Sequence, residues 1–138
     1  MIRRPYLLAL LVLPLALGSA QPSARTLRFL FLGDQGHHRP AERFRQLAPI
    51  LAERGIELEY TERLTDLNPQ KLAGFDGLLI YANHTEISTE QERALLEFVA
   101  GGKGLAAVHC ASYCFLNSPA YVELVGAQFK EHGTGVFR

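Results

Sequence analysis

Histidines are the side chains of this sequence that are best placed to do chemistry. All five lie outside the helices and strands that the sequence predicts: His37, His38, His84, His109 and His132. His84 and His109 directly follow apolar runs that are typical of buried β-strands, and ligands in an open α/β sheet bind at the carboxyl ends of the strands. Because imidazole gains and loses protons near neutral pH, these positions predict a site for a polar ligand or for proton transfer.

The segment HCASYCF, residues 109–115, holds both cysteines of the chain. A strand that runs through a tight turn into a helix can hold a nucleophile above the sheet, where the helix amino end lowers a thiol pKa. Such a turn needs small residues two positions before and after the nucleophile. These positions hold two alanines around His109, but a valine and a serine around Cys110. We therefore expect Cys110 to be a buried neighbour of the site, and catalysis by Cys110 is the alternative.

Other interpretations of the cysteines stay open. An oxidising compartment would permit a disulfide between Cys110 and Cys114, although so small a loop gains little stability from closure. Zinc could be bound by His109, Cys110 and Cys114, with a fourth ligand from elsewhere. A c-type haem is excluded because it requires two cysteines separated by two residues and followed by histidine. No motif specifies a cofactor or a metal, so both are unknown from the sequence.

The loop GDQGHHRP, residues 33–40, lies between the first predicted strand and the first predicted helix. Its glycines could turn backbone amides toward an anion, but the third glycine of a dinucleotide fingerprint is missing. We expect Asp34, His37 and His38 to hydrogen-bond a polar ligand or to bind a metal ion. The alternative is an aspartate and glycine turn with solvated histidines. His84 joins this set of ligand-binding candidates only by its place after the third predicted strand.

Alternating strands and helices must position these side chains. Apolar runs predict strands at residues 27–32, 56–60, 77–82 and 105–108. Helix signals predict helices at residues 40–54, 69–74, 89–100 and 119–125. Pro49 predicts a kink or a restart in the first helix, and acidic residues in the second strand place that strand near a sheet edge. The alternation predicts an α/β fold, a three-layer sandwich with a mostly parallel sheet.

The first twenty residues have the features of a secretory signal peptide. Arg3 and Arg4 precede an apolar run, and small residues at 18–20 match what signal peptidase requires. We therefore expect a periplasmic or secreted protein. The predicted division of the chain is a signal peptide at 1–20, a linker at 21–26 and one α/β domain at 27–138.

The charge balance excludes several classes of partner. The chain carries 14 basic and 14 acidic side chains, and this balance produces no field that would favour nucleic acid or an anionic membrane. No segment after the signal approaches the roughly 20 apolar residues that a spanning helix needs. We therefore expect no nucleic-acid partner and no membrane span beyond the signal.

Four motifs together resemble a known family. FLGDQGHHRP, GFDGLLIYANHTEIS, GKGLAAVHCASYCF and YVELVGAQFKEHGTGVF, in this order and spacing, resemble the trehalose-utilisation (ThuA-like) family of the class I glutamine amidotransferase-like superfamily. The resemblance implies a flavodoxin-like sheet, a role in sugar metabolism, and fused or associated redox modules such as dehydrogenases or cytochromes. It also implies that His109 and His132 are pocket residues, with Asp34, His37 and His38 on the same rim. Domains of this family usually run on for tens of residues more, so we expect the sheet to be incomplete at the C-terminus.

The same resemblance weakens an amidotransferase function. In true class I amidotransferases a Gly-x-Cys-x-Gly elbow works with a later His and Glu, and neither glycine flanks Cys110. The leading hypothesis is an exported domain that binds or processes a small carbohydrate, a sugar or keto-sugar, with His109 and His132 as general acid or base. One alternative is a non-catalytic binding or docking module of a larger redox protein. Another is an amidotransferase-like cysteine hydrolase that uses Cys110.

Overall fold

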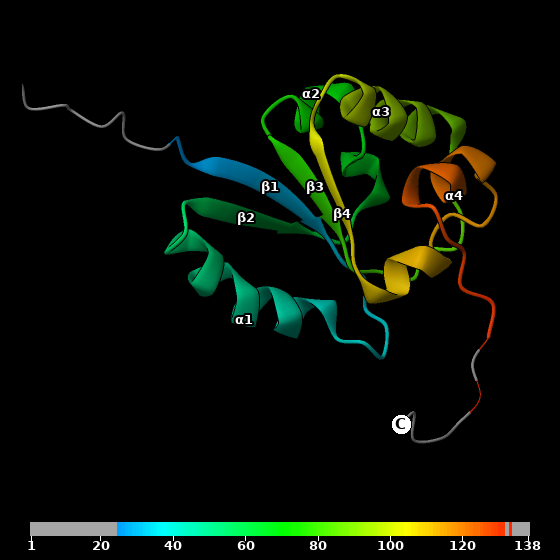
Figure 1. Cartoon of the computed structure of the whole chain (residues 1–138), viewed down its shortest axis with the longest axis horizontal. Coiled ribbons are helices and arrows are strands. Elements are labelled where there is room, and N and C mark those ends of the chain that lie inside the picture. Colours follow the sequence, from blue (N-terminus) through cyan, green and yellow to red (C-terminus); the bar gives the residue numbers. More distant parts are fainter. Residues whose placement is uncertain (1–24, 132, 134–138) are drawn as a thin grey trace, which may run out of the picture.

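The protein is described here by a computed structural model, which covers residues 25–131 and 133. Its elements are, in order, β1 (Leu27–Leu32), α1 (Pro40–Ala52), β2 (Ile56–Thr61), η1 (Leu64–Asp66), α2 (Pro69–Leu72), β3 (Gly77–Ile80), α3 (Thr89–Ala100), β4 (Gly104–Ala107), η2 (His109–Tyr113) and α4 (Pro119–Val125). The four strands pair in parallel in the order β2-β1-β3-β4 (Figure 1). The predicted α/β class with a parallel sheet is confirmed. The predicted signal peptide, residues 21–24 of the predicted linker, and His132 lie outside the described residues.

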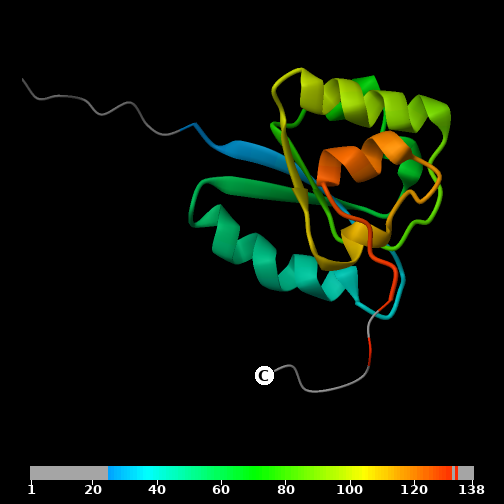
Figure 2. The same cartoon turned by 45° about the vertical axis from the view of Figure 1, so that its right-hand side comes forward.

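Helices cover both faces of the sheet, as a three-layer sandwich requires. Helix α1 lies on one face, and α2, α3 and α4 lie over the other (Figures 1 and 2). Side chains alternate along β1: Leu30 and Leu32 are fully buried in the main core, while the Phe31 ring packs edge-on against Phe44 of α1 at 5.8 Å between centroids. Each such apolar side chain stabilises the fold by about 1.5–3 kcal/mol. The period-2 pattern of β1 therefore explains why both of its faces are covered.

Three helices begin at the residues that the sequence predicts. The side chains of Asn68 and Ser118 each accept a hydrogen bond from a backbone N–H in the first turn of α2 and α4. Ser88 and Gln91 form a complete capping box at the start of α3. Each cap is worth about 1 kcal/mol, and together they set where the loops of the sheet rim end. No helix in the described part of the chain is long and apolar enough to cross a membrane.

The sequence predicts a kink or a restart of helix α1 at Pro49, and the structure decides on the restart. The predicted restart is absent, because α1 runs through Pro49 to Ala52. Proline removes one backbone hydrogen bond, but the carbonyl of Pro49 still accepts the N–H of Glu53 at 3.3 Å. The last turn of the helix therefore closes despite the missing N–H.

The fourth strand also differs from the expectation. The sequence predicts β4 to be buried, but its residues are half-buried or exposed, and Val108 just beyond it is 41% exposed. This prediction is wrong because β4 is an edge strand among the described residues and pairs only with β3. Helix α1 does not cover β4, since it packs beside β2 at the opposite edge of the sheet. The predicted edge position of β2 is confirmed.

Candidate functional site

The candidate site lies where the chain order reverses across the sheet. The chain passes from β1 outward to β2 and then crosses to β3 on the other side of β1. Ligands of open α/β sheets bind in the crevice outside the carboxyl ends of the strands at such a switch point. Here the crevice is bounded by the loops that follow β1 and β3, and by η2, which follows β4.

Two side chains join these loops to one another. The Asp34 carboxylate accepts the backbone N–H of Gly36 at 2.7 Å through Oδ1 and the backbone N–H of Asn83 through Oδ2. His84 Nε2 lies 3.0 Å from the carbonyl oxygen of Gly33. A carbonyl oxygen only accepts, so Nε2 of His84 carries the proton. Asp34 and His84 therefore hold the loops after β1 and β3 together.

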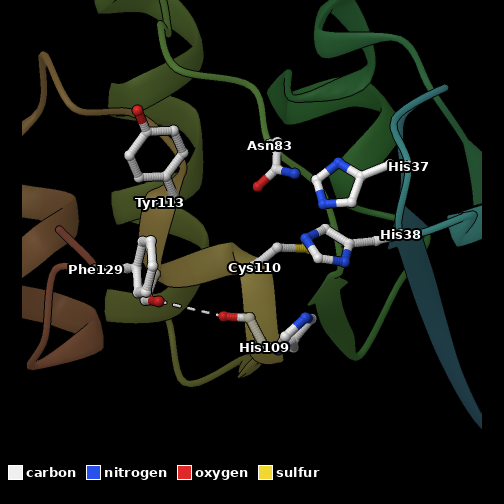
Figure 3. Close-up of a pocket in the computed structure, with 8 residues that line it drawn as sticks. His37, His38, Asn83, His109, Cys110, Tyr113 and Phe129 are labelled. Carbon is white, nitrogen blue, oxygen red and sulfur yellow. Dashed lines mark hydrogen bonds between the residues drawn. The ribbon is translucent and has the colours of Figure 1, made fainter. Parts of the chain in front are cut away.

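A cavity of about 520 Å³ opens between these loops and η2. Its lining residues come from four segments of the chain: His37, His38, Asn83, His109, Cys110, Ser112, Tyr113 and Phe129. Figure 3 shows His37 and His38 on one side of the cavity, with Tyr113 and Phe129 on the opposite side. The volume falls in the range of about 300–1,000 Å³ that is usual for small-molecule sites.

His37, His38 and His109 form a cluster, called here the histidine cluster. The ring centroids of His37 and His38 lie 3.9 Å apart, and those of His38 and His109 lie 4.5 Å apart. Tyr81 stacks on His109 at 5.8 Å and 30°. Burial lowers the pKa of His38, and the neighbouring His37 and His109 lower it further, while Asp34 opposes them. His38 is therefore a neutral imidazole at neutral pH, able to accept a proton.

His109 is the first residue of η2 and lies on the sharp turn that follows β4. Its φ is 53°, in the left-handed region that residues other than glycine rarely adopt, whereas Cys110 has no such backbone angle. The turn is held by the N–H of Ala111, which donates to the Val108 carbonyl at 3.1 Å, and by the Ser112 hydroxyl, which donates to the His109 carbonyl at 3.2 Å. The elbow position that would carry a nucleophile is thus occupied by histidine, in agreement with its small flanking residues.

Both cysteines are buried free thiols, and Cys110 also lines the cavity. Burial raises the pKa of Cys110 to about 11, and the charge of Asp34 adds to this effect. Burial raises the pKa of Cys114 to about 12, and its Sγ donates to the carbonyl of Ala82 at 2.9 Å. Neither thiol is poised as a thiolate, so the geometry gives no support to a Cys110 nucleophile. Among the described residues, no three or more His, Cys, Asp or Glu side chains are arranged to hold a metal ion.

We expect Cys110 to react slowly with electrophiles in the folded protein. A rise of its pKa from 9.0 to about 11 lowers the thiolate fraction at neutral pH roughly 100-fold. Iodoacetamide labelling of a Cys114→Ala variant at pH 7.5, in the native state and in urea, measures this difference. Native labelling as fast as labelling in urea would contradict the raised pKa and restore the hydrolase alternative.

The predicted site residues divide into three groups. His37, His38, His109 and Cys110 line the cavity, Asp34 and His84 bond to the loops around it, and His132 lies outside the described residues. Sequence reasoning did not single out four further lining residues: Asn83, Ser112, Tyr113 and Phe129. The first three lie within or beside motifs that the histidines and cysteines marked. Phe129 lies in the motif YVELVGAQFKEHGTGVF, but nothing in that motif indicates that the fold returns its ring to the cavity.

Comparisons with known proteins agree with this architecture. A family model described as "ThuA: Trehalose utilisation" matches residues 28–137. The fold is similar to the crystal structure of a ThuA-like protein from Bacteroides uniformis, with a TM-score of 0.57 and 18% sequence identity. The alignment covers 79% of this chain and 47% of that protein, so the chain spans about half the length of the solved relative. No curated protein matches the chain significantly.

Proposed function

The chain belongs to the ThuA family of trehalose utilisation, and on this basis we propose that its cavity binds a sugar or keto-sugar on which the histidine cluster acts as acid and base. The family description supplies the class of ligand, and the cavity supplies the chemistry. One observation carries the proposal: the rings of His38 and His109 lie 4.5 Å apart in one cavity at the strand ends, where burial lowers the pKa of His38.

The polar side of the cavity suits a carbohydrate. A neutral imidazole has one nitrogen that accepts and one that donates, so it can take the proton of a sugar hydroxyl. His38 is the base in this proposal because its lowered pKa keeps it unprotonated at neutral pH. His109 lies on its turn beside His38 and donates a hydrogen bond to the ligand oxygen that gains negative charge. The Asn83 amide can hydrogen-bond to a further hydroxyl or to a keto oxygen of the ligand.

Tyr81 and Asp34 hold the histidine cluster in place and do not line the cavity themselves. Tyr81 stacks on His109 and meets His38 edge-on at 6.2 Å between centroids. Asp34 fixes the loop that carries His37 and His38 to the loop that carries Asn83. Such positioning groups matter because a small displacement of a reacting group costs a large part of its effect.

Isothermal titration calorimetry with trehalose and with its keto derivative tests the proposal. We expect His38→Ala and His109→Ala each to weaken binding at least about 10-fold, because each removes a hydrogen bond in a partly enclosed site. Glu97→Gln, at an exposed position on α3, is the matched control and should bind as the wild type does. If neither sugar binds the wild-type protein, or if both histidine variants bind them normally, the proposed function is wrong.

A further inference from the structure

Two aromatic side chains form the wall of the cavity opposite the histidines. Tyr113 comes from η2 and Phe129 from the segment after α4, and their ring centroids lie 6.0 Å apart in an edge-to-face arrangement at 78°. Tyr113 is 37% exposed and Phe129 is 40% exposed. Each residue leaves more than a third of its surface open beside the cavity, where an aromatic ring can contact a ligand. We call Tyr113 and Phe129 the aromatic wall.

The aromatic wall has a defined position in the fold. The backbone N–H of Phe129 donates to the carbonyl of Ser112 at 2.9 Å, beside Tyr113 in the chain. The Ser112 hydroxyl in turn donates to the His109 carbonyl, as the dashed line in Figure 3 marks. The segment that carries Phe129 is thus connected to the turn that carries His109. The spacing between the aromatic wall and the histidine cluster is therefore set by η2.

The two sides of the cavity differ in chemistry. Imidazole rings and the Asn83 amide offer hydrogen bonds, whereas the ring of Phe129 offers only an apolar surface. Figure 3 shows the aromatic wall and the His37 and His38 rings facing each other, with Cys110 and Asn83 between them. A pyranose ring carries hydroxyls at its edge and C–H groups on its faces, so the hydroxyls of one ring of a disaccharide suit the histidines and the face of the other ring suits an aromatic side chain.

We propose that the aromatic wall is a second subsite, which holds the non-reacting ring of a disaccharide while the histidine cluster holds the reacting ring. This proposal rests on the proposed function and adds to it the number of rings and the residues that select for them. Tyr113 and Phe129 are specificity-determining residues: they contact the ligand but take no part in proton transfer. A monosaccharide contacts the histidine cluster alone and gains nothing from the aromatic wall.

The absence of tryptophan from the chain allows a direct test. Phe129→Trp places a single tryptophan in the aromatic wall and keeps a stacking surface, so its fluorescence reports on that subsite alone. We expect trehalose to shift or quench the emission and methyl glucoside to leave it unchanged. The control is Leu124→Trp on α4, which is similarly exposed at 38% and outside the cavity lining, and whose emission neither sugar should change. Unchanged Phe129→Trp emission while calorimetry records trehalose binding would overturn the second subsite.

Truncation of the aromatic wall tests the selectivity. Phe129→Ala and Tyr113→Ala should each weaken trehalose binding by about 5- to 10-fold, and methyl glucoside binding should stay within about twofold of the wild type. Equal losses for both sugars, or no loss for either, would overturn the second subsite. In that case a continued loss of binding in His109→Ala would leave the proposed function standing. If no sugar binds the wild-type protein at all, both proposals fail together.

Discussion

Replacement of Phe115 by alanine is expected to lower the free energy of unfolding by about 3–5 kcal/mol. Phe115 is fully buried, and its ring meets that of Tyr121 at 4.9 Å between centroids. Its backbone N–H donates to the His84 carbonyl at 2.7 Å, which ties the end of η2 to the loop after β3. Removing the ring leaves a cavity under η2 that the surrounding core cannot fill by small movements.

Urea unfolding followed by circular dichroism measures this loss. The neighbouring Leu116 provides a matched control, because its side chain is 37% exposed and Leu116→Ala should cost less than about 1 kcal/mol. Since η2 carries part of the cavity lining, the Phe115 variant should also bind any ligand of the cavity more weakly. A loss below about 1 kcal/mol for Phe115→Ala would show that the core under η2 is not packed as described.

Replacement of Asp34 by alanine is expected to cost at least about 1.5 kcal/mol of stability and to separate the loops that carry the candidate site. Its carboxylate accepts the N–H groups of Gly36 and Asn83, one from each side of the crevice. Hydrogen bonds to a charged acceptor contribute about 1.5–3 kcal/mol, and alanine leaves both N–H groups without this partner. Chemical unfolding measures the loss, and the imidazole signals of His37 and His38 in NMR spectra report the movement of the loop.

Asp34→Asn separates the two roles of this carboxylate. Asparagine keeps one acceptor oxygen but loses the charge, so we expect a smaller loss of stability than with alanine. The negative charge of Asp34 raises the pKa of His38 against the lowering effects of burial, His37 and His109. Both variants should therefore lower the pKa of His38 further, as an NMR titration of its imidazole would record. An unchanged or raised pKa of His38 in Asp34→Asn would contradict the proximity of the two groups.

Much of the fold could be predicted because its signals are local. The apolar runs of β1 and β3 and the caps at Asn68, Ser88 and Ser118 depend only on nearby residues, and all of them appear in the structure. One prediction failed where the outcome depends on distant contacts. The burial of a strand depends on what lies beside it, so the apolar composition of β4 did not reveal its edge position. Of the kink or restart that Pro49 predicts, the restart is absent, since α1 continues to Ala52.

The candidate site could be predicted only in part. His37, His38 and His109 follow strands, and parallel strands end at the same rim, so their proximity follows from the order of elements. Asn83 and Tyr113 lie next to marked residues, yet nothing local distinguishes them from ordinary loop residues. Phe129 lies sixteen residues after Tyr113 in the chain, and the two rings meet only because α4 returns the chain to η2.

Local sequence is sufficient to specify the parallel α/β architecture, the starts of the helices and the rim on which the histidines lie, since each of these depends on periodicity, caps and turns. The roles of the individual side chains depend on tertiary contacts. Asp34 bonds to backbone amides, His84 bonds to a carbonyl, and His109 takes the elbow position beside the buried Cys110. Burial and neighbouring charges set the pKa values of His38 and Cys110, and part of this effect comes from distant residues, His109 for His38 and Asp34 for Cys110. The folded chain therefore decides which of the polar residues at the rim face a ligand and which hold the rim together.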